Sequence, residues 1–440
     1  MFAYHVRLAF VSFRRNPVLA GLMVLAIALG VAMSMSAFTV LHVMARDPIP
    51  EKSTRLFAVQ IDNGGPRSRA PGDDEPPTQL SYRDAMALLA AHGGARQAAM
   101  HQVSVTLASV APGARQISVS GRATSADFFA MFDVPLRFGR AWTQTEEASG
   151  TRLVVLSAAL NDRLFGGENS VGRDVELSDK LWRVVGVADA WDPKPRFFDV
   201  IGGQSFDEGE DIYLPLKASV DEEMSTAGYE FCDAGPRGTT FADLLRSECV
   251  WLQYWVELPT SEDAARYRDA LANYSAEQRT SGRFNWAPNA RLRDVRAWLV
   301  ARHVVSDDAR LSTVVAFAFF AVCLVCALGL MLARSLERAG EFSLRRALGA
   351  SRATVFSQAA TESVMIGATS GVLGVVLTMT SLWLMRSLFP AQLGRIAWMD
   401  RDLVVATVAL SALATLVAGL YPAWRAMRTP PALQLKGGQG

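Results

Sequence analysis

The pattern of polar and apolar positions contains four long runs without Asp, Glu, Lys or Arg. They lie between Arg15 and Arg46 and over 311–333, 363–385 and 403–424. A helix needs about 20 residues to cross the hydrocarbon core of a bilayer, so each run is long enough for one span. Buried helices of soluble proteins seldom stay uncharged for so long, and four such runs argue against that alternative. The pattern therefore predicts transmembrane helices at 17–45, 311–333, 355–386 and 402–424.

The run nearest the N-terminus differs from a cleaved signal peptide. Its apolar stretch exceeds the ~7 to 15 residues of a signal h-region, and no small-x-small cleavage site follows it. We therefore expect a retained anchor. Residues 1–16, which precede it, set apolar side chains such as Phe10 and Phe13 against Arg14 and Arg15. This pattern is typical of an amphipathic helix lying in the inner membrane interface, in contact with lipid, although a simple positively charged flank would need no helix.

Positive charges beside the spans predict the orientation. Arginines and one lysine precede the first span, separate the second from the third and follow the fourth: Arg7, Arg14, Arg15, Arg334, Arg338, Arg345, Arg346, Arg352, Arg425, Arg428 and Lys436. The positive-inside rule places these flanks in the cytoplasm. Arg386, Arg395 and Arg401, in and beside the short loop 387–401, weaken the contrast without reversing it. We predict cytoplasmic N- and C-termini, with 425–440 as a cytoplasmic tail, and an external segment from 46 to 310.

The external segment has the pattern of a mixed α/β domain over 46–290. Partial alternation and β-branched or aromatic residues predict strands at 56–62, 116–122, 151–157, 171–188 and 250–258, the fourth split by a turn at 178–180. Helices are predicted at 81–91, 125–132, 157–166 and 261–279, with N-caps at Ser125, Ser157 and Ser261. Apolar residues recur at helical spacing over 291–310 without a proline, which predicts a continuous stalk helix leading into the second span.

Charge and motifs exclude several function classes. The formal net charge of +1 does not favour nucleic-acid binding. None of the five lysines follows a glycine, so the chain lacks the phosphate-binding GxxxxGK[ST] loop. It also lacks HExxH, GxSxG and a zinc-type cysteine spacing outside the spans. We therefore expect no catalytic residue, no metal site and no cofactor bound by this chain, and an enzyme with a site assembled from distant residues ranks behind the alternatives below.

Small residues and cysteines supply candidate structural sites. Cys232 and Cys249 lie in the external segment, where an oxidising compartment allows a disulfide. Small residues recur along one face of the first and third spans, at Ala28, Ala32 and Ser36 and at Gly367, Gly371 and Gly374. Such faces let helices approach closely, either within the subunit or across a dimer. Glycine is also simply common in membrane helices, so the pattern alone does not distinguish these meanings.

One segment resembles a family signature. EFSLRRALGASRATVFSQAATESVMIGATSGVLGVVL (341–377) is similar to the MacB/FtsX-like family of ABC transporter permeases, in which an acidic residue precedes an RRALGA-R core and a Glu-containing entry into a glycine-rich helix. The likeness extends to RLAFVSFRRNP (7–17), to WRVVGVA (182–188), and to 125–144, 151–177 and 421–436. It covers nearly the whole chain. This resemblance implies four transmembrane α-helices with a large mixed α/β extracytoplasmic domain inserted between the first and second.

The resemblance also implies a function and partners. In this family the loop between the second and third helices docks on an ATPase, which assigns that contact to the coupling segment 334–354, at Glu341, Arg345, Arg346, Leu348, Gly349 and Arg352. A separate ATP-binding subunit would bind ATP and magnesium, because no ATPase domain is fused at the N-terminus. A second permease copy, either identical or paralogous, would complete a dimer in the bacterial inner membrane. A periplasmic adaptor and an outer-membrane channel remain open as further partners.

In such permeases, ATP-driven movement of the helices changes the shape of the periplasmic domain, a process called mechanotransmission that drives efflux of a periplasmic substrate. Two alternatives from the same family remain: a lipoprotein-releasing permease, and an FtsX-like regulator that activates a cell-wall hydrolase. The chain departs from the family pattern at 342–344, where Phe, Ser and Leu replace an acidic or isoleucine-rich pattern. The stretch 217–249 is longer than the family core requires and is expected to be an insertion stapled by the cysteines if they are bridged.

Overall fold

A computed structural model describes residues 17–65, 74–108, 116–201, 205–233, 235, 238–337, 351–388 and 401–428. The chain divides into two compact units. The helical unit combines Met1–Ala45 with Val305–Gly440, and the α/β unit is Arg46–Val304. Each unit is described by itself below.

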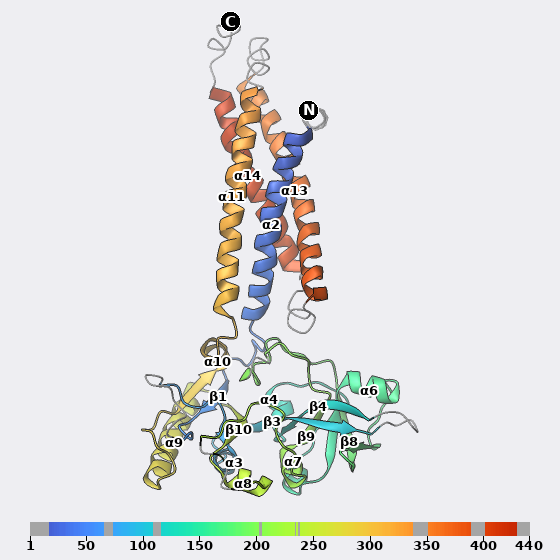
Figure 1. Cartoon of the computed structure of the whole chain (residues 1–440), viewed down its shortest axis with the longest axis vertical. Helices are drawn as coiled ribbons and strands as arrows, with labels where there is room; N and C mark the ends of the chain where they lie inside the picture. The colour runs from blue at the N-terminus through green and yellow to red at the C-terminus, as the bar shows by residue number, and fades with distance from the viewer. Residues whose placement is uncertain are drawn as a thin grey trace, which may run out of the picture. The chain divides into compact units, whose positions relative to one another are not determined.

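The helical unit is built from long helices that lie side by side (Figure 1). They are α2 (Pro17–Ala45), α11 (Asp307–Glu337), α13 (Arg352–Leu388) and α14 (Arg401–Arg428). Both α2 and α14 pack against α11 and against α13, and they also pack against each other. The backbones of α11 and α13 therefore lie on opposite sides of the bundle. Apolar side chains including Met23, Ile27 and Val31 fill its core.

Three helices of the described part of the chain are long and apolar enough to cross a membrane: Pro17–Ala45, Asp307–Arg334 and Ala360–Leu388. Their outward faces are apolar too, with exposed residues such as Leu25, Val325 and Val372. So many exposed apolar side chains are unfavourable in water and favourable in contact with lipid. The fourth apolar run forms α14, whose side chains beyond Leu416 lie outside the described residues.

The α/β unit contains one large mixed sheet with helices on both faces (Figure 1). Its main strand order is β11-β1-β10-β3-β4-β9-β6-β8-β5, with β2 paired to β10 and β7 paired to β3 and β8. The β4–β9 and β6–β8 pairs are parallel and the other pairs are antiparallel. The strands are β1 (Leu56–Gln60), β2 (Leu80–Ser81), β3 (Arg96–Leu107), β4 (Ile117–Thr124), β5 (Leu136–Gly139), β6 (Leu153–Leu156), β7 (Asp174–Leu177), β8 (Lys180–Ala188), β9 (Ile212–Pro215), β10 (Val250–Glu257) and β11 (Arg291–Asp294).

Helices cover this sheet on both faces because successive strand residues point to opposite sides. Ala99 belongs to one core and its neighbours Ala98 and Met100 to the other. The first core includes residues of α3 and α9, and the second includes residues of α4 and α10. The helices of this unit are α3 (Tyr82–Ala90), α4 (Phe128–Met131), α5 (Gln144–Ala148), α6 (Ala158–Phe165), α7 (Leu216–Asp221), α8 (Phe241–Arg246), α9 (Ser261–Thr280) and α10 (Val295–Ala301).

Local signals at turns and caps were only partly informative. The turn predicted at 178–180 joins β7 to β8, with Ser178 and Asp179 at positive φ. Ser157 caps α6 by accepting a hydrogen bond from the Leu160 N–H. The prediction for Ser261 is wrong by one residue, because Thr260 caps α9 in a capping box. The prediction for Ser125 is also wrong: its hydroxyl accepts a hydrogen bond from the Ala99 N–H of β3 and α4 starts later.

The predicted continuous stalk helix over 291–310 is wrong. Arg291–Asp294 instead form β11, which pairs with β1. Asp294 then caps the short helix α10, and the chain leaves helical geometry near His303, where φ is +49°. Two of the apolar residues in this range, Val295 and Trp298, are instead buried in the core of the α/β unit. Pairing with β1 satisfies the backbone of 291–294 and overrides the local helical pattern.

Candidate functional site

The predicted coupling segment is bounded by two described helices. The preceding helix α11 ends at Glu337, and α13 begins at Arg352, so Arg352 is its first residue. Glu341, Arg345, Arg346, Leu348 and Gly349 lie outside the described residues. The structure therefore describes the helices on either side of this segment.

An ion pair joins those two helices. Nη2 of Arg334 on α11 lies 2.6 Å from Oε1 of Glu362 on α13, and their side chains are 6% and 15% exposed. Each residue stands at the end of a charge-free run, directly after 333 and directly before 363. A charge in this position is costly unless it has a partner. The sequence marked both residues as run boundaries but gave no sign that they meet.

The small residues of the first and third spans lie in contacts within this chain. Gly374 of α13 faces α2: a Cβ built on it would lie 3.3 Å from Cγ1 of Val31 and 3.7 Å from the Ala28 carbonyl oxygen. Gly371 faces α14, where its Cβ would lie 3.3 Å from Cβ of Ser411. Small side chains at these positions let the helix backbones come close together.

The other three small residues have different surroundings. Ala32 and Ser36 are buried in α2. Gly367 lines an apolar groove of 640 Å³ between α13 and α14, together with residues that include Val364 and Val408. A further close approach that sequence reasoning missed is at Gly30, where a Cβ would lie 2.9 Å from the Phe320 ring of α11. Ala–Leu–Gly–Val patterns are too common in membrane helices to have singled it out.

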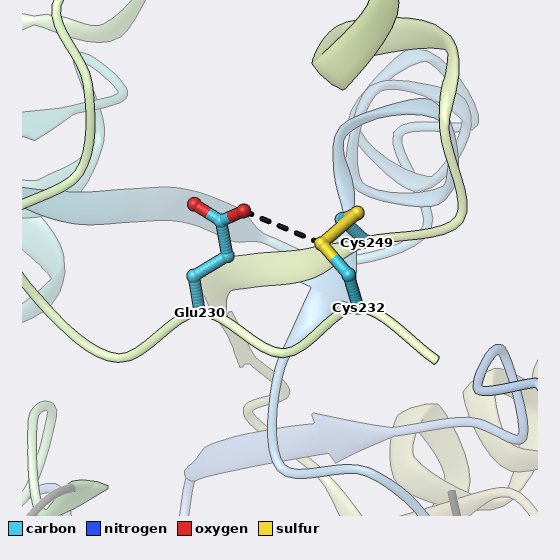
Figure 2. Close-up of side chains that lie close together, drawn as sticks. All are labelled: Glu230, Cys232 and Cys249. Carbon is cyan, nitrogen blue, oxygen red and sulfur yellow. Dashed lines mark hydrogen bonds between the residues drawn. A yellow bond between two sulfur atoms is a disulfide. The ribbon is translucent and has the colours of Figure 1, made fainter. Parts of the chain in front are cut away.

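A disulfide links Cys232 to Cys249 in the α/β unit. It ties the segment after α7 to the start of β10 and closes a loop with a sequence separation of 17. Figure 2 shows the Glu230 carboxylate directed toward it, with Oε1 3.3 Å from Sγ of Cys232. These three side chains could reach a common ion by distance. A metal binds thiolate, however, and neither sulfur is a thiolate while the disulfide is intact.

A buried cluster of charges holds the connection between β8 and β9 against the sheet. Arg122 of β4 is 0% exposed; its Nε lies 2.5 Å from Oε1 of Glu210 and its Nη2 lies 2.5 Å from Oδ2 of Asp199. Arg196 also donates a hydrogen bond to Glu210, and Gln253 of β10 donates one to Asp199. Two guanidinium groups thus balance two carboxylates in a region without water contact.

The charges in this cluster set the protonation states around it. Burial opposes ionisation of Glu210, but Arg122 and Arg196 outweigh that effect and hold the pKa of the carboxyl below its usual range. Burial lowers the pKa of His101 on β3 to about 3, and the charge of Arg122 acts in the same direction. His101 is therefore neutral at ordinary pH, and Glu210 is ionised. At ordinary pH the cluster therefore keeps the ion pairs of Glu210 with Arg122 and Arg196.

Comparison with known families finds two matches that together cover most of the chain. Residues 20–274 match the MacB-like periplasmic core domain, and residues 313–431 match the FtsX-like permease C-terminal domain. The chain belongs to the MacB/FtsX-like permease family. It is a membrane protein of the ABC permease type with a MacB-like periplasmic core domain inserted between its first two long apolar helices.

The relatives of this permease include larger proteins. The chain is 23% identical over 351 residues to the macrolide export ATP-binding/permease protein MacB of Syntrophobacter fumaroxidans, covering 71% of this chain and 46% of that protein. The corresponding protein of Rhodopirellula baltica is 26% identical over 308 residues, with coverage of 67% and 42%. The chain thus spans somewhat less than half the length of the curated relatives it matches. This chain contains an FtsX-like permease domain. Neither of the two family models that it matches describes an ATPase domain.

Solved structures similar to this permease come from the extracytoplasmic regions of related proteins. The periplasmic region of MacB from Actinobacillus actinomycetemcomitans is 15% identical, with a TM-score of 0.36, and the match covers 59% of this chain and 96% of that one. The extracellular domain of the noncanonic ABC-type transporter YknZ from Gram-positive bacteria is 12% identical, with a TM-score of 0.34 and coverage of 54% and 99%.

Proposed function

We propose that this chain is the membrane subunit of an ABC transporter in which a separate ATPase supplies the energy. The observation that carries the proposal is the combination of an FtsX-like permease domain over 313–431 and a MacB-like core domain over 20–274 on a chain without a phosphate-binding loop. The RRALGASR motif (345–352) lies inside the first of these matches. Arginines on such a segment supply planar donors for acidic or carbonyl groups of a partner.

The proposed topology has four spans, with α14 as the fourth, and cytoplasmic N- and C-termini. It is supported by the arginines beside the spans and by the absence of Asp, Glu, Lys and Arg from 403–424. The α/β unit is then periplasmic, where a disulfide between Cys232 and Cys249 is stable. The coupling segment lies in the cytoplasm, within reach of an ATPase.

In the proposed mechanism two permease copies work with two ATPase subunits. ATP binding draws the ATPases together and displaces the coupling segments that dock on them. The helices then move as packed bodies and change the shape of the periplasmic units, which drives efflux of a periplasmic substrate, with an adaptor and an outer-membrane channel as further partners. Charged side chains are absent from the apolar runs, which fits a mechanism in which no polar substrate crosses between the helices.

Affinity purification of the solubilised full-length chain tests this proposal. Wild type is compared with the double variant Arg345→Glu/Arg346→Glu, and all co-purifying proteins are identified. The matched control is Arg386→Glu/Arg395→Glu, which makes the same charge change in and beside the loop after α13. We expect a P-loop ATPase to co-purify with the wild type and with the control, but not with the Arg345→Glu/Arg346→Glu variant. The proposal fails if no ATPase is recovered with wild type, even after crosslinking in native membranes.

A further inference from the structure

The ion pair between Arg334 and Glu362 connects two helices that otherwise meet through their neighbours. Both α2 and α14 pack against α11 and α13 and so lie between them in the bundle. The side chains of Arg334 and Glu362 bridge this diagonal with an N–O distance of 2.6 Å. A long, planar guanidinium is suited to reach across and hold a carboxylate in one orientation. The pair therefore fixes a separation that direct backbone packing between α11 and α13 does not fix.

The position of the pair along the helices links it to the coupling segment. Arg334 lies in the last turn of α11 and so stands at the start of that segment. Glu362 lies ten residues after the start of α13 at Arg352, and at 1.5 Å per residue this first part of α13 is about 15 Å long. The coupling segment thus lies between the two paired residues in the sequence, and the first part of α13 connects its end to Glu362.

The chemistry of the pair suits a fixed joint better than a sliding contact. Other contacts among the described helices include apolar and small residues, such as Gly374 against Val31, which can shift along one another at little cost. Two opposite charges at the boundary of the apolar runs are different, because separating them loses a strong attraction in a region with little solvent. The closed pair holds α11 and α13 at a fixed separation at this depth.

We propose that Arg334 and Glu362 are positioning residues for energy coupling: their ion pair locks the cytoplasmic ends of α11 and α13 together, so that displacement of the coupling segment moves both helices. This inference rests on the proposed function, since it requires an ATPase on the coupling segment. The inference adds that docking of the ATPase does not by itself couple ATP hydrolysis to the permease. Coupling also requires that Arg334 and Glu362 are paired.

The test separates docking from coupling in the full-length chain, reconstituted with the ATPase that co-purifies with it. The variants are Arg334→Met, Glu362→Gln and the exchanged pair Arg334→Glu/Glu362→Arg. The matched control is Arg310→Met, which removes an arginine with an ion pair to Asp307 at the opposite end of the same helix. The readouts are the amount of ATPase bound per permease and the stimulation of ATP hydrolysis by the permease.

We expect each single variant to keep bound ATPase and to lose stimulation by at least about fivefold, the lower end of ordinary coupling between sites. The exchanged pair should regain most of the stimulation, and Arg310→Met should match wild type. A purely structural role would lower binding and stimulation in parallel, and that result would overturn the inference. Arg334→Gln serves in the same assay, with the same expected result, if Arg334→Met does not reach the membrane.

Two negative results have different meanings. If wild-type permease recovers no ATPase, the proposed function fails and this inference fails with it. If wild type binds the ATPase and stimulates it, and the single variants do so equally well, the proposed function stands and only the positioning role of the pair is overturned.

Discussion

Replacement of Arg122 by methionine tests whether the buried charge cluster stabilises the α/β unit as its geometry indicates. Methionine has a similar length and no charge, so it removes the two ion pairs without leaving a large cavity. The variant leaves Asp199 and Glu210 with a single guanidinium, that of Arg196. The cluster, which balances in the wild type, then carries one buried negative charge.

The expected loss of stability follows from the burial of the cluster. Two unit charges about 4 Å apart attract by roughly 4 kcal/mol at an effective dielectric constant near 20. Removing one partner of a buried pair costs about 3–5 kcal/mol, because the other charge stays without compensation. This is a large share of the ~5–15 kcal/mol that stabilises a domain, and it corresponds to a fall in melting temperature of about 10 °C for a domain of this size.

Urea and thermal unfolding of the α/β unit, expressed as residues 46–304, supply the measurement. The matched control is Arg183→Met on β8, which also breaks an arginine–aspartate pair, but an exposed one with Asp174. Solvent screens such a pair, so we expect its unfolding midpoint to equal that of wild type. Adding Glu210→Gln to Arg122→Met should recover part of the loss, because it restores a neutral cluster.

The dependence on pH sharpens this test. In the wild type the pKa of Glu210 is low, so the carboxyl stabilises the unit while it is ionised. Without Arg122 the same buried carboxyl should take up a proton more readily, and the deficit of the variant should shrink below about pH 5. An Arg122→Met variant as stable as the Arg183→Met control would refute the reasoning, since it would mean that the cluster is hydrated and its charges contribute little.

Three further predictions concern other contacts. Replacing both Cys232 and Cys249 by alanine should cost roughly 3 kcal/mol in the α/β unit, as expected for a loop of this size; urea unfolding should show the same loss for wild type in reductant and no effect of reductant on the variant. Burial raises the pKa of Glu147 from 4.5 to about 7. Glu147→Gln should therefore be more stable than wild type above pH 7, by up to about 3 kcal/mol, and this advantage should vanish below about pH 4.5. Unfolding measured across this pH range tests the prediction, and a difference in stability that does not change with pH would contradict the raised pKa. Gly374→Leu should force α13 away from α2 and lower the melting temperature of the full chain in detergent, whereas Gly329→Leu, which has open space around it, should not.

The sequence predicted best what local pattern decides. The long apolar runs became helices because a continuous apolar surface leaves few alternatives in a membrane. β6 and β10 were recognised because their β-branched and aromatic residues are buried along their whole length. The strand β3 was missed for two reasons. Its first part, RQAAMHQ, lacks β-branched residues, and its side chains are buried on both faces of the sheet, so polar and apolar residues do not alternate along it. Its position depends on pairing with β4 and β10, which no local pattern contains.

The important charge contacts could not be predicted from the sequence for a related reason. Arg122 and Glu210 are 88 residues apart, and their pairing follows from the parallel alignment of β4 with β9. Arg334 and Glu362 were visible as the limits of the apolar runs, but their contact depends on the depth at which α11 and α13 pack. The small residues were found because their spacing along one helix face is local information, although the choice of partner helix was not.

The chain enters and leaves the α/β unit along neighbouring strands. The chain enters the α/β unit before β1 and leaves it after β11, and these strands are antiparallel neighbours in which Phe57 is paired with Asp294. The two connections are also tied to each other, by the ion pair of Arg296 with Asp47 and by the hydrogen bond from the Val295 N–H to the Ser53 carbonyl. In the proposed mechanism a displacement of α2 relative to α11 would reach the α/β unit through this strand pair, because the chain enters and leaves the unit there. The disulfide and the buried charge cluster hold other parts of the α/β unit together, so we expect the proposed change of shape to begin at β1 and β11.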